Sequence, residues 1–528
     1  MADVIPSVVD GLKEHERLAL FWALELFSDG EGVEVNELAM TTFRSAPNYS
    51  VQIREEAVVR FAQNFIGTNN INLFEPVGDF GNRYKGPLDS GVDTTGLEIS
   101  INPITRFIFV KDDDSVAMQA LEGCSSCVKS PNWLIPIIPF ILVNGCHGKG
   151  SWLKSCIPKY KLDDIIANIR LYLQDKEMLP MIPWFKGFKG TVELSPTDDA
   201  QYIISGVIGK TDHRRRAVTI TELPVGLWTH EYITWLNSQQ WIQSVKDLSE
   251  SNGTIHVEVI LSNDAWLADE QYLMKRLELI RTISMTDMRA IDPCGDVVKF
   301  ENPLHIIMDF ADFRSAFYEK RKGVLLANIN SKLKSIEFDI KSSIEVACHS
   351  SNIVKHWMSK LKKSPETVKL SNLLNSLCDK VEAIDKARLV NIELENDVVT
   401  LLGRVVTLRQ SQRSRGRNHL SEDDFLALET VCNALKKVEN AISEVRVLCL
   451  ARNDLKGRLC QLQREDGLSL WLKDLDRLEL FIKEQCPEVE ESQSKKREAT
   501  AERSRGVKRK AGFSHQGYET SLPIGNLM

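Results

Sequence analysis

A helical repeat of apolar residues in the last third of the chain constrains the fold more than any other feature. Near Pro303 the sequence changes character, and apolar residues then recur every three or four positions, the spacing of packed or coiled-coil helices. This pattern predicts long helices, either as a bundle core or as an antiparallel coiled coil with a dimer contact at its tip. We expect the polar, basic stretch 410–419 to be a loop. The repeat comprises Phe313, Phe317, Val324, Ile329, Leu333, Ile336, Ile340 and Ile344, then Leu370, Leu373, Leu377, Val381 and Ile384, then Leu428, Leu435, Val438, Ile442, Val445, Leu448, Leu455, Leu459 and Leu462.

Shorter predicted helices and strands precede this repeat. Residues 53–66 have the apolar face of a helix, and Gly67 is placed to end it. Four segments rich in β-branched residues read as strands: residues 191–194, 202–207, 217–220 and 254–261. The chain is therefore predicted to be α+β, with regions at 1–135, 136–305, 306–485 and 486–528, the last being a disordered basic tail.

Composition excludes several classes of protein. The 528 residues are 43% hydrophobic and 26% charged, which are ordinary globular values. The most apolar stretch, 133–143, is too short for a membrane span and contains two prolines, so no membrane partner is expected. The N-terminus lacks the apolar core of a secretory signal. The eleven cysteines form no framework and read as reduced thiols of an intracellular protein.

Positive charge is concentrated locally, although the net charge is −7. Residues 123–162 contain no acid, and a glycine-rich loop at 78–86 holds two cations. Loops of this kind suit phosphate contacts, which position a duplex without reading its sequence. The alternative is that these are ordinary exposed cations. The predicted DNA-binding residues are Arg83, Lys85, Lys149, Lys154 and Lys159.

The tail carries two basic clusters at the separation of a bipartite nuclear import signal, so we expect a nuclear protein. A solvated basic tail without a receptor is the alternative reading. In either case a flexible cationic segment would add salt-dependent attraction to phosphates. The candidate nuclear localisation residues are Lys495, Lys496, Arg497, Lys508, Arg509 and Lys510.

Three motifs suggest phosphate or metal chemistry but fit it poorly. Residues 145–151 have only two residues between the first Gly and the Gly-Lys pair, whereas a phosphate loop needs four. Cys124 and Cys127 form a single CxxC, with further candidate zinc ligands only at irregular spacing. Residues 112–114 are three successive aspartates, which we interpret as a solvated acidic loop. We therefore predict no metal site.

Several segments together resemble the type IIA DNA topoisomerases, in the region shared by eukaryotic topoisomerase II and the gyrase A subunit. They include AQNFIGTNN, GDFGNR and IPIIP, and they occur in family order. The matches are dense over about 1–230 and sparse after 340. The segments are residues 5–13, 62–73, 78–83, 135–145, 179–191, 221–228 and 470–475.

This resemblance implies a fold and a chemistry. It implies a winged-helix domain at 1–135, an α/β tower domain at 136–305 and a coiled-coil exit gate of long antiparallel helices at 306–485. In that family a tyrosine attacks a DNA phosphate with the help of metal ions. The metal-binding and ATPase domains precede this region, so we expect no cofactor in this chain. ATP and Mg²⁺ would enter only if the family activity were supplied in trans.

The sequence departs from the family where the chemistry should be. Ungapped matching places Thr95 at the position of the tyrosine and Thr94 at that of the neighbouring arginine. A threonine hydroxyl is far less acidic than a phenol and is a poorer leaving group for religation. The isoleucine that the family inserts between base pairs falls on Lys149, which cannot act as an apolar wedge. Tyr84 and Tyr49 are the nearest tyrosines, but neither occupies the motif position.

These observations predict a topoisomerase II-like protein that binds double-stranded DNA and dimerises, without an intact catalytic site of its own. One alternative is a component of an ATP-dependent type II topoisomerase that changes DNA topology by double-strand passage with the missing domains in trans. Another is an interaction module that heterodimerises with an active topoisomerase II and modulates it. Whether any enzyme activity survives is left open by the sequence.

Overall fold

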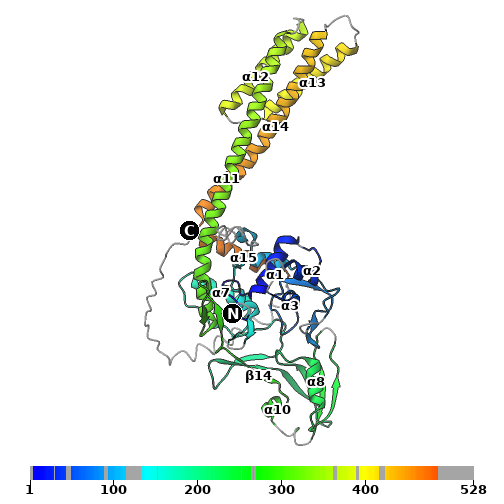
Figure 1. Cartoon of the computed structure of the whole chain (residues 1–528), viewed down its shortest axis with the longest axis vertical. Coiled ribbons are helices and arrows are strands. Elements are labelled where there is room, and N and C mark those ends of the chain that lie inside the picture. The colour runs from blue at the N-terminus through cyan, green and yellow to red at the C-terminus, as the bar shows by residue number, and fades with distance from the viewer. Residues whose placement is uncertain are drawn as a thin grey trace.

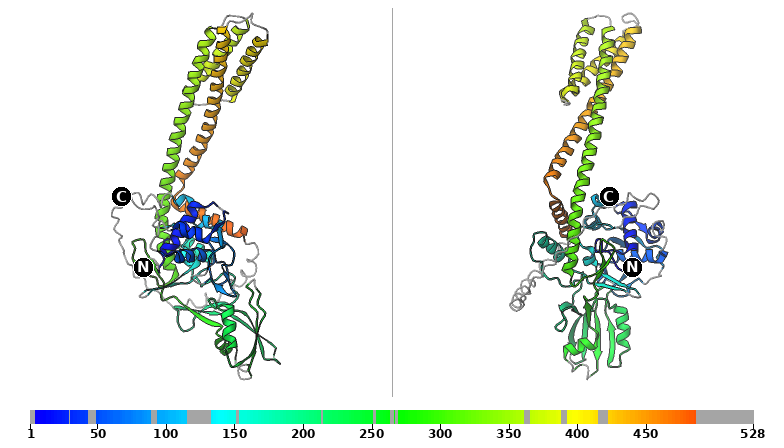
Figure 2. Two further views of the ribbon diagram at one scale, coloured as in Figure 1. Left: turned by 45° about the vertical axis from the view of Figure 1, so that its right-hand side comes forward. Right: turned by 60° about the vertical axis from the view of Figure 1, so that its left-hand side comes forward.

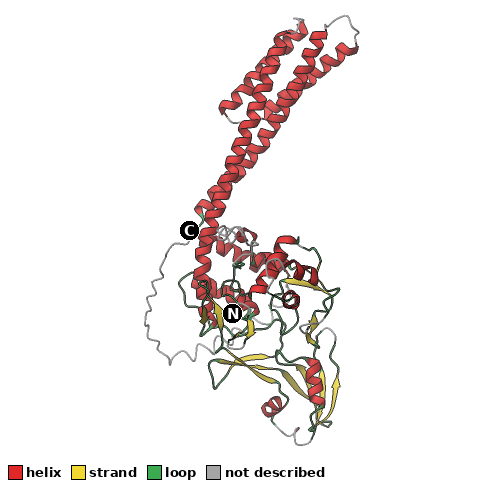
Figure 3. Ribbon diagram, viewed as in Figure 1, coloured by secondary structure: helices red, strands yellow, loops and turns green. Residues whose placement is uncertain are grey.

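The computed structural model describes residues 4–28, 30–42, 49–88, 93–114, 133–150, 153–212, 214–250, 253–262, 266, 269–360, 365–387, 392–414 and 422–485. It is a mixed α/β structure in which an α/β body carries a long helical stalk (Figures 1 and 3). Within these described segments, no helix is both long enough and apolar enough to cross a membrane.

The first part of the body combines three helices with a small antiparallel sheet. The helices are α1 (Glu14–Leu26), α2 (Val35–Thr41) and α3 (Val51–Ala62), and α3 begins where the Ser50 hydroxyl accepts a hydrogen bond from the Ile53 amide. The sheet has the order β1-β5-β2. Its strands are β1 (Val33–Glu34), β5 (Glu98–Ile101) and β2 (Phe74–Val77), followed by the ribbon β3 (Gly81–Asn82) and β4 (Gly86–Pro87) and by α4 (Pro103–Ile108).

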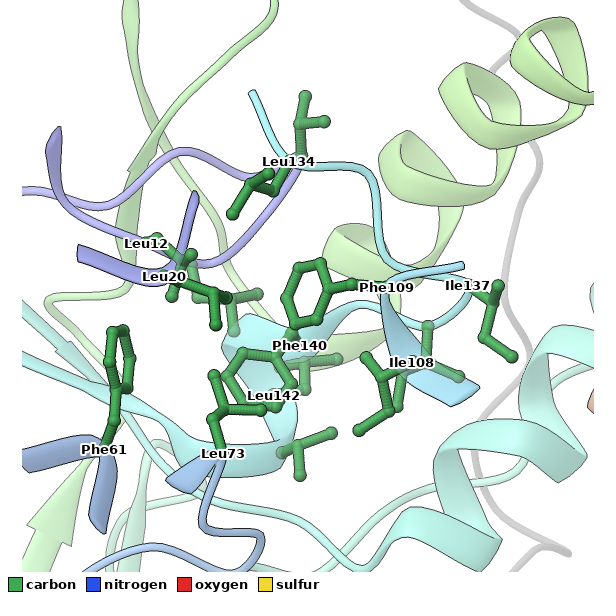
Figure 4. Close-up of a cluster of buried hydrophobic side chains, with 14 of the residues drawn as sticks. Leu12, Leu20, Phe61, Leu73, Ile108, Phe109, Leu134, Ile137, Phe140 and Leu142 are labelled. Atoms are coloured by element: carbon green, nitrogen blue, oxygen red, sulfur yellow. The ribbon is translucent and has the colours of Figure 1, made fainter. Parts of the chain in front are cut away.

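A second group of elements packs on this part and shares its core. It contains α6 (Phe140–Asn144), the hairpin β6 (Cys146–Lys149) and β7 (Lys154–Ile157), and α7 (Leu162–Tyr172). The apolar segment 133–143 is buried here, with the Phe140 ring 5.7 Å from that of Phe109 (Figure 4). Burial of large side chains at about 25 cal/mol per Å² is the main stabilising contribution of such a core.

Two further sheets extend from the body, away from the stalk. A three-stranded sheet has the order β14-β9-β8, and a four-stranded sheet has the order β10-β11-β13-β12. Helices α8 (Thr229–Asn237) and α10 (Glu270–Arg276) contribute to the core of the second sheet. The strands are β8 (Thr191–Leu194), β9 (Gln201–Ser205), β10 (Val207–Asp212), β11 (Ala217–Glu222), β12 (Ile242–Asp247), β13 (Val257–Leu261), β14 (Ile280–Ser284), and the pair β15 (Arg289–Ile291) and β16 (Val297–Lys299).

The stalk is built on two long helices, α11 (Pro303–Lys360, 58 residues) and α14 (Glu422–Arg464, 43 residues). They are antiparallel, because later residues of α11 contact earlier residues of α14: Glu337 pairs with Lys456, and Ser343 with Glu444. Helices α12 (Pro365–Ala387) and α13 (Ile392–Ser414) fold back at the far end and share a separate apolar core with them (Figure 2). The stalk therefore combines an antiparallel helix pair with a helical bundle at its tip.

One predicted loop is partly helical. Residues 410–414 lie in α13 instead of a loop, whereas residues 415–419 fall outside the described part. The helix continues because 410–414 contain neither glycine nor proline, and a polar composition by itself does not end a helix.

The base of the stalk is joined to the body by a buried ionic cluster, which we call the stalk joint: Asp113, Arg314, Tyr318, Arg321 and Asp474. The Arg314 guanidinium donates to Asp113 at 2.6 Å, and Asp474 accepts from Arg321 at 2.7 Å and from the Tyr318 hydroxyl at 2.9 Å. All five residues are buried. Although burial opposes the charge on Arg314, its pKa is raised because Asp113 lies so close.

The stalk joint corrects the interpretation of residues 112–114 as a solvated acidic loop, which is wrong. Asp112 and Asp113 pair with arginines of α11, and Asp114 pairs with Arg106 of α4 at 3.1 Å. The arginines that neutralise Asp112 and Asp113 lie about 200 positions further along the chain. Local sequence could not reveal them.

Candidate nucleic-acid interface

The hairpin of β6 and β7 presents positive charge on one face and packs with the other. Its register pairs His147 with Cys156 and Lys149 with Lys154, so these four side chains share a face. The opposite face is built for close packing: a Cβ at Gly148 would collide with the Val4 carbonyl, and the buried Ser155 hydroxyl donates to the Arg289 carbonyl at 2.6 Å.

Several cations act together at this hairpin. Burial lowers the pKa of His147, and the charges of four cations lower it further. Lys154 pairs with Asp287 at 3.3 Å, yet half of its side chain is exposed. Both Lys149 and Lys154 face solvent. The hairpin can therefore attract phosphate groups through charge. The cations that act on His147 are Lys154, Lys13, Arg60 and Lys149.

Lys159 points into the protein instead of toward solvent. Its ammonium donates to the carbonyl oxygens of Gly67, at 3.3 Å, and Thr68. Burial lowers the pKa of this lysine to about 8. Lys159 braces the turn that follows α3, so its expected role as an exposed phosphate contact is not supported by its position.

Arg83 also requires correction. Its side chain is 1% exposed, pairs with Glu222 at 3.2 Å and donates to the carbonyls of Leu227 and Leu223 at 2.6 and 2.7 Å. It thereby ties the β3–β4 ribbon to the end of β11, and a buried guanidinium with these partners is not placed to contact DNA. Lys85, two residues later, is exposed and pairs with Asp79 at 3.3 Å, so it remains a candidate contact.

Thr95, which we expect from the sequence resemblance to match the family tyrosine, lies beside carboxylates. The exposed Thr95 hydroxyl donates to Asp93 at 2.5 Å, and the Thr94 hydroxyl donates to Glu55 of α3 at 3.2 Å. Hydrogen bonds from Thr95 lower the pKa of Asp93, so this carboxylate is a weak base. Both acids would also repel a phosphate brought to these hydroxyls.

Neither nearby tyrosine has the surroundings of an activated nucleophile. The Tyr84 hydroxyl donates to Asp247 at 2.8 Å, and this hydrogen bond raises the pKa of Tyr84. The Tyr49 hydroxyl donates to Glu14 at 2.9 Å. A carboxylate partner favours the protonated phenol because it repels the phenolate.

The other sequence motifs take their places as follows. Residues 146–149 form a strand of the hairpin, so this glycine-rich segment does not open a helix as a phosphate loop does. In the described part of the chain, no three His, Cys, Asp or Glu side chains lie together as metal ligands could. Cys124 and Cys127 lie outside the described residues. So do the six nuclear localisation candidates, Lys495, Lys496, Arg497, Lys508, Arg509 and Lys510.

Sequence reasoning overlooked a second concentration of positive charge. Arg214, Arg215 and Arg216 form the turn between β10 and β11, and the first two are exposed. Three successive arginines between two predicted strands were a visible signal of a cationic hairpin turn.

The protein is thus a mixed α/β protein with a cationic hairpin and an antiparallel helical stalk. Comparison with known proteins identifies its family. The chain belongs to the DNA gyrase/topoisomerase IV A-subunit family, whose model matches residues 4–505. The resemblance to the type IIA breakage-reunion region is thereby confirmed.

Individual relatives agree with this assignment. The chain is 30% identical over 493 residues to DNA topoisomerase 2 of Arabidopsis thaliana, an alignment that covers 91% of this chain and 32% of the relative. It is 31% identical over 392 residues to DNA topoisomerase 2 of Candida albicans, covering 70% and 26%. The alignments thus span between about a quarter and a third of the length of these curated relatives.

A solved structure is similar over most of the chain. It is the Plasmodium falciparum topoisomerase II DNA-binding, cleavage and re-ligation domain, with a TM-score of 0.65 and 26% identity. The match covers 91% of this chain and 62% of that one. The chain is therefore homologous to the DNA-binding and cleavage region of topoisomerase II.

Proposed function

We propose that this chain is a topoisomerase II-like protein that binds double-stranded DNA and dimerises but does not cleave DNA by itself. The proposal rests on the contrast between an exposed cationic hairpin, with Lys149 and Lys154, and Thr95, the residue that the sequence resemblance aligns with the nucleophile of the family. The first suits phosphate contacts. The second lacks the acidic hydroxyl and the base that cleavage would require.

We further propose a role for each part of the architecture. Helices α1–α3 with the β1-β5-β2 sheet correspond to the winged-helix region, and the two larger sheets to the tower. The stalk corresponds to the coiled-coil exit gate, and its tip is the proposed site of the dimer contact. Support comes from the element order and from the family match across 4–505. The basic tail is proposed to direct the protein to the nucleus.

A second candidate function is that of a partner chain for an active topoisomerase II. The family match extends through the stalk, so the chain could keep a surface for pairing although it does not keep the nucleophile. Mg²⁺ and ATP would then be held by domains of the other chain. In this arrangement the present chain supplies only DNA contacts and the helical gate.

Binding of a labelled duplex at two salt concentrations tests the proposed function. The affinity should fall steeply with salt, and a Lys149→Ala/Lys154→Ala variant should bind more weakly and with a shallower salt dependence. A Lys436→Ala/Lys437→Ala variant, which removes two exposed cations of α14, is the matched control. Salt-insensitive binding, or equal loss in both variants, would refute the hairpin as the contact.

Light scattering tests the dimer separately. A particle of twice the chain mass at micromolar concentration is expected for the chain alone. A monomer that pairs only when topoisomerase II is added would favour the second candidate instead.

A further inference from the structure

The far end of the four-stranded sheet gathers cations and aromatic rings in one place. Strand β11 ends at Glu222, which pairs with Arg83 of the body, and it begins just after Arg216. Six strand residues span about 20 Å, so Arg216 lies that far from the body attachment. Helix α10 lies at the same far end, opposite to the stalk (Figure 1).

Backbone hydrogen bonds connect the elements of this end, which we call the distal tip: Arg214, Arg215, Arg216, Trp241, Tyr272, Lys275 and Arg276. The Arg216 carbonyl accepts from the Leu261 amide, and the Trp241 carbonyl accepts from the amide of the next residue, Ser262. Arg216 and Trp241 therefore flank the same strand end. Arg276 lies over the Trp241 ring, 4.4 Å from its centroid, which joins α10 to the group.

The aromatic and guanidinium groups of the distal tip are positioned so that they can stack on a ligand. The Trp241 ring fixes one face of the Arg276 guanidinium, and Arg276 is partly exposed. Tyr272 stands four positions before Arg276, on the same face of α10, and its side chain is 54% exposed. The exposed Tyr272 ring and the planar guanidinium of Arg276 therefore offer two flat surfaces on which bases can stack.

The charge around these planes favours a phosphate-bearing ligand. Arg214 and Arg215 are exposed on the turn, and Lys275 is exposed next to Arg276. Acids are present as well, because the Asp269 carboxylate caps α10 by accepting from the Tyr272 amide at 2.8 Å, and Glu270 and Glu278 are exposed. The five cations of the distal tip outnumber these three acids. Cations that neutralise phosphates, combined with planes that stack on bases, are the elements of single-strand recognition.

We propose that the distal tip is a binding site for single-stranded nucleic acid, separate from the β6–β7 hairpin. Arg214, Arg215 and Lys275 neutralise phosphates, while Tyr272 and Arg276 stack on unpaired bases. Single strands are favoured over duplex because the faces of paired bases are covered by their neighbours, so the exposed Tyr272 ring has nothing to stack on in a duplex. The function proposed above does not require this site.

The test uses the full chain and three labelled probes: a 12-nucleotide oligothymidylate, an abasic oligomer of the same length, and a duplex. Tyr272→Ala should weaken oligothymidylate binding roughly 5- to 100-fold, the range that one lost stacking contact produces. Tyr272→Phe keeps the ring and should bind like the parent. Neither change should alter binding of the abasic oligomer or the duplex.

A charge variant provides the second arm. Arg214→Ala/Arg215→Ala should weaken binding of both single strands and reduce its salt dependence, whereas Lys436→Ala/Lys437→Ala on the stalk should not. Equal effects of these two variants, or an oligothymidylate affinity unchanged by Tyr272→Ala, would overturn the proposal. Equal losses for oligomer and duplex would overturn the preference for single strands. Duplex binding that depends on Lys149 and Lys154 but not on the distal tip would leave the proposed function intact.

Discussion

The stalk joint and the β6–β7 hairpin both concentrate charge, but they place it in opposite surroundings. In the joint, Arg314 is fully buried and its charge is held by Asp113 at 2.6 Å. On the hairpin, Lys149 and Lys154 face water. Removing one partner of a buried ion pair leaves an uncompensated charge, whereas exposed cations contribute little to folding and remain available for phosphates. Cationic side chains are therefore part of the buried framework in one region and are exposed to solvent in the other.

The largest expected effect comes from breaking the stalk joint. Asp113→Ala removes the carboxylate that Arg314 and Arg321 share and leaves Arg314 buried without a charged partner. This change should destabilise the protein by about 3–5 kcal/mol. The midpoint of urea unfolding, followed by tryptophan fluorescence, measures this. Asp112→Ala is the matched control, since the Asp112 side chain is 55% exposed and should cost less than about 1 kcal/mol. Similar losses in the two variants would mean that burial is not what makes the joint strong.

Arg83→Ala should produce the next largest effect, about 3 kcal/mol, because it leaves Glu222 buried without its partner. DNA affinity measured under conditions where the variant is folded should change little. Lys85→Ala should do the reverse, with stability unchanged and duplex binding weakened. A folded Arg83→Ala protein that loses more DNA affinity than Lys85→Ala would restore Arg83 as a DNA contact.

Removing the two exposed lysines of the β6–β7 hairpin should affect DNA binding and leave stability almost unchanged. Lys149→Ala/Lys154→Ala should weaken duplex binding about tenfold and reduce the slope of log K against log salt by about 2, since two phosphate contacts are lost. Its unfolding midpoint should stay within about 0.5 kcal/mol of the parent. A large loss of stability would show that these lysines are structural, as Arg83 is.

Asp114 is intermediate in exposure between the stalk joint and the hairpin lysines, and we expect its substitution to have the smallest effect on stability. Burial raises its pKa to about 6, despite Arg106, whereas an unfolded aspartate titrates near pH 4. The folded protein therefore binds the extra proton between about pH 4 and 6, and its stability should fall as the pH rises through that window. Asp114→Asn should remove the part of this fall that is due to Asp114. An unchanged pH profile would assign the titration to another group.

The sequence predicted the helical stalk and the separate strands well, because helix and strand periods are local properties. Residues 217–220, for example, lie within β11 as expected. It also predicted the family, because long motifs carry that information. It could not predict which charges are buried. Asp113 and Arg83 are neutralised by residues 201 and 139 positions away, so only the tertiary structure brings the partners together.

The candidate site was therefore predicted only in part. Lys85, Lys149 and Lys154 are exposed as expected, but Lys159 and Arg83 are turned into the protein. Tyr84 and Tyr49 were rejected as nucleophiles on spacing alone, and their hydrogen bonds to Asp247 and Glu14 now supply a physical reason.

Trapping of covalent DNA adducts tests the central claim most directly. The chain is incubated with labelled supercoiled plasmid, Mg²⁺ and ATP, alone and with an excess of the ATPase and metal-binding domains of topoisomerase II. It is then denatured with detergent and resolved from free DNA, beside an active topoisomerase II as the positive control. We expect no label on this chain in either mixture, because Thr95 offers no phenolic oxygen. Label attached to the chain, mapped by mass spectrometry to Thr95, Tyr84 or any other residue, would contradict the account.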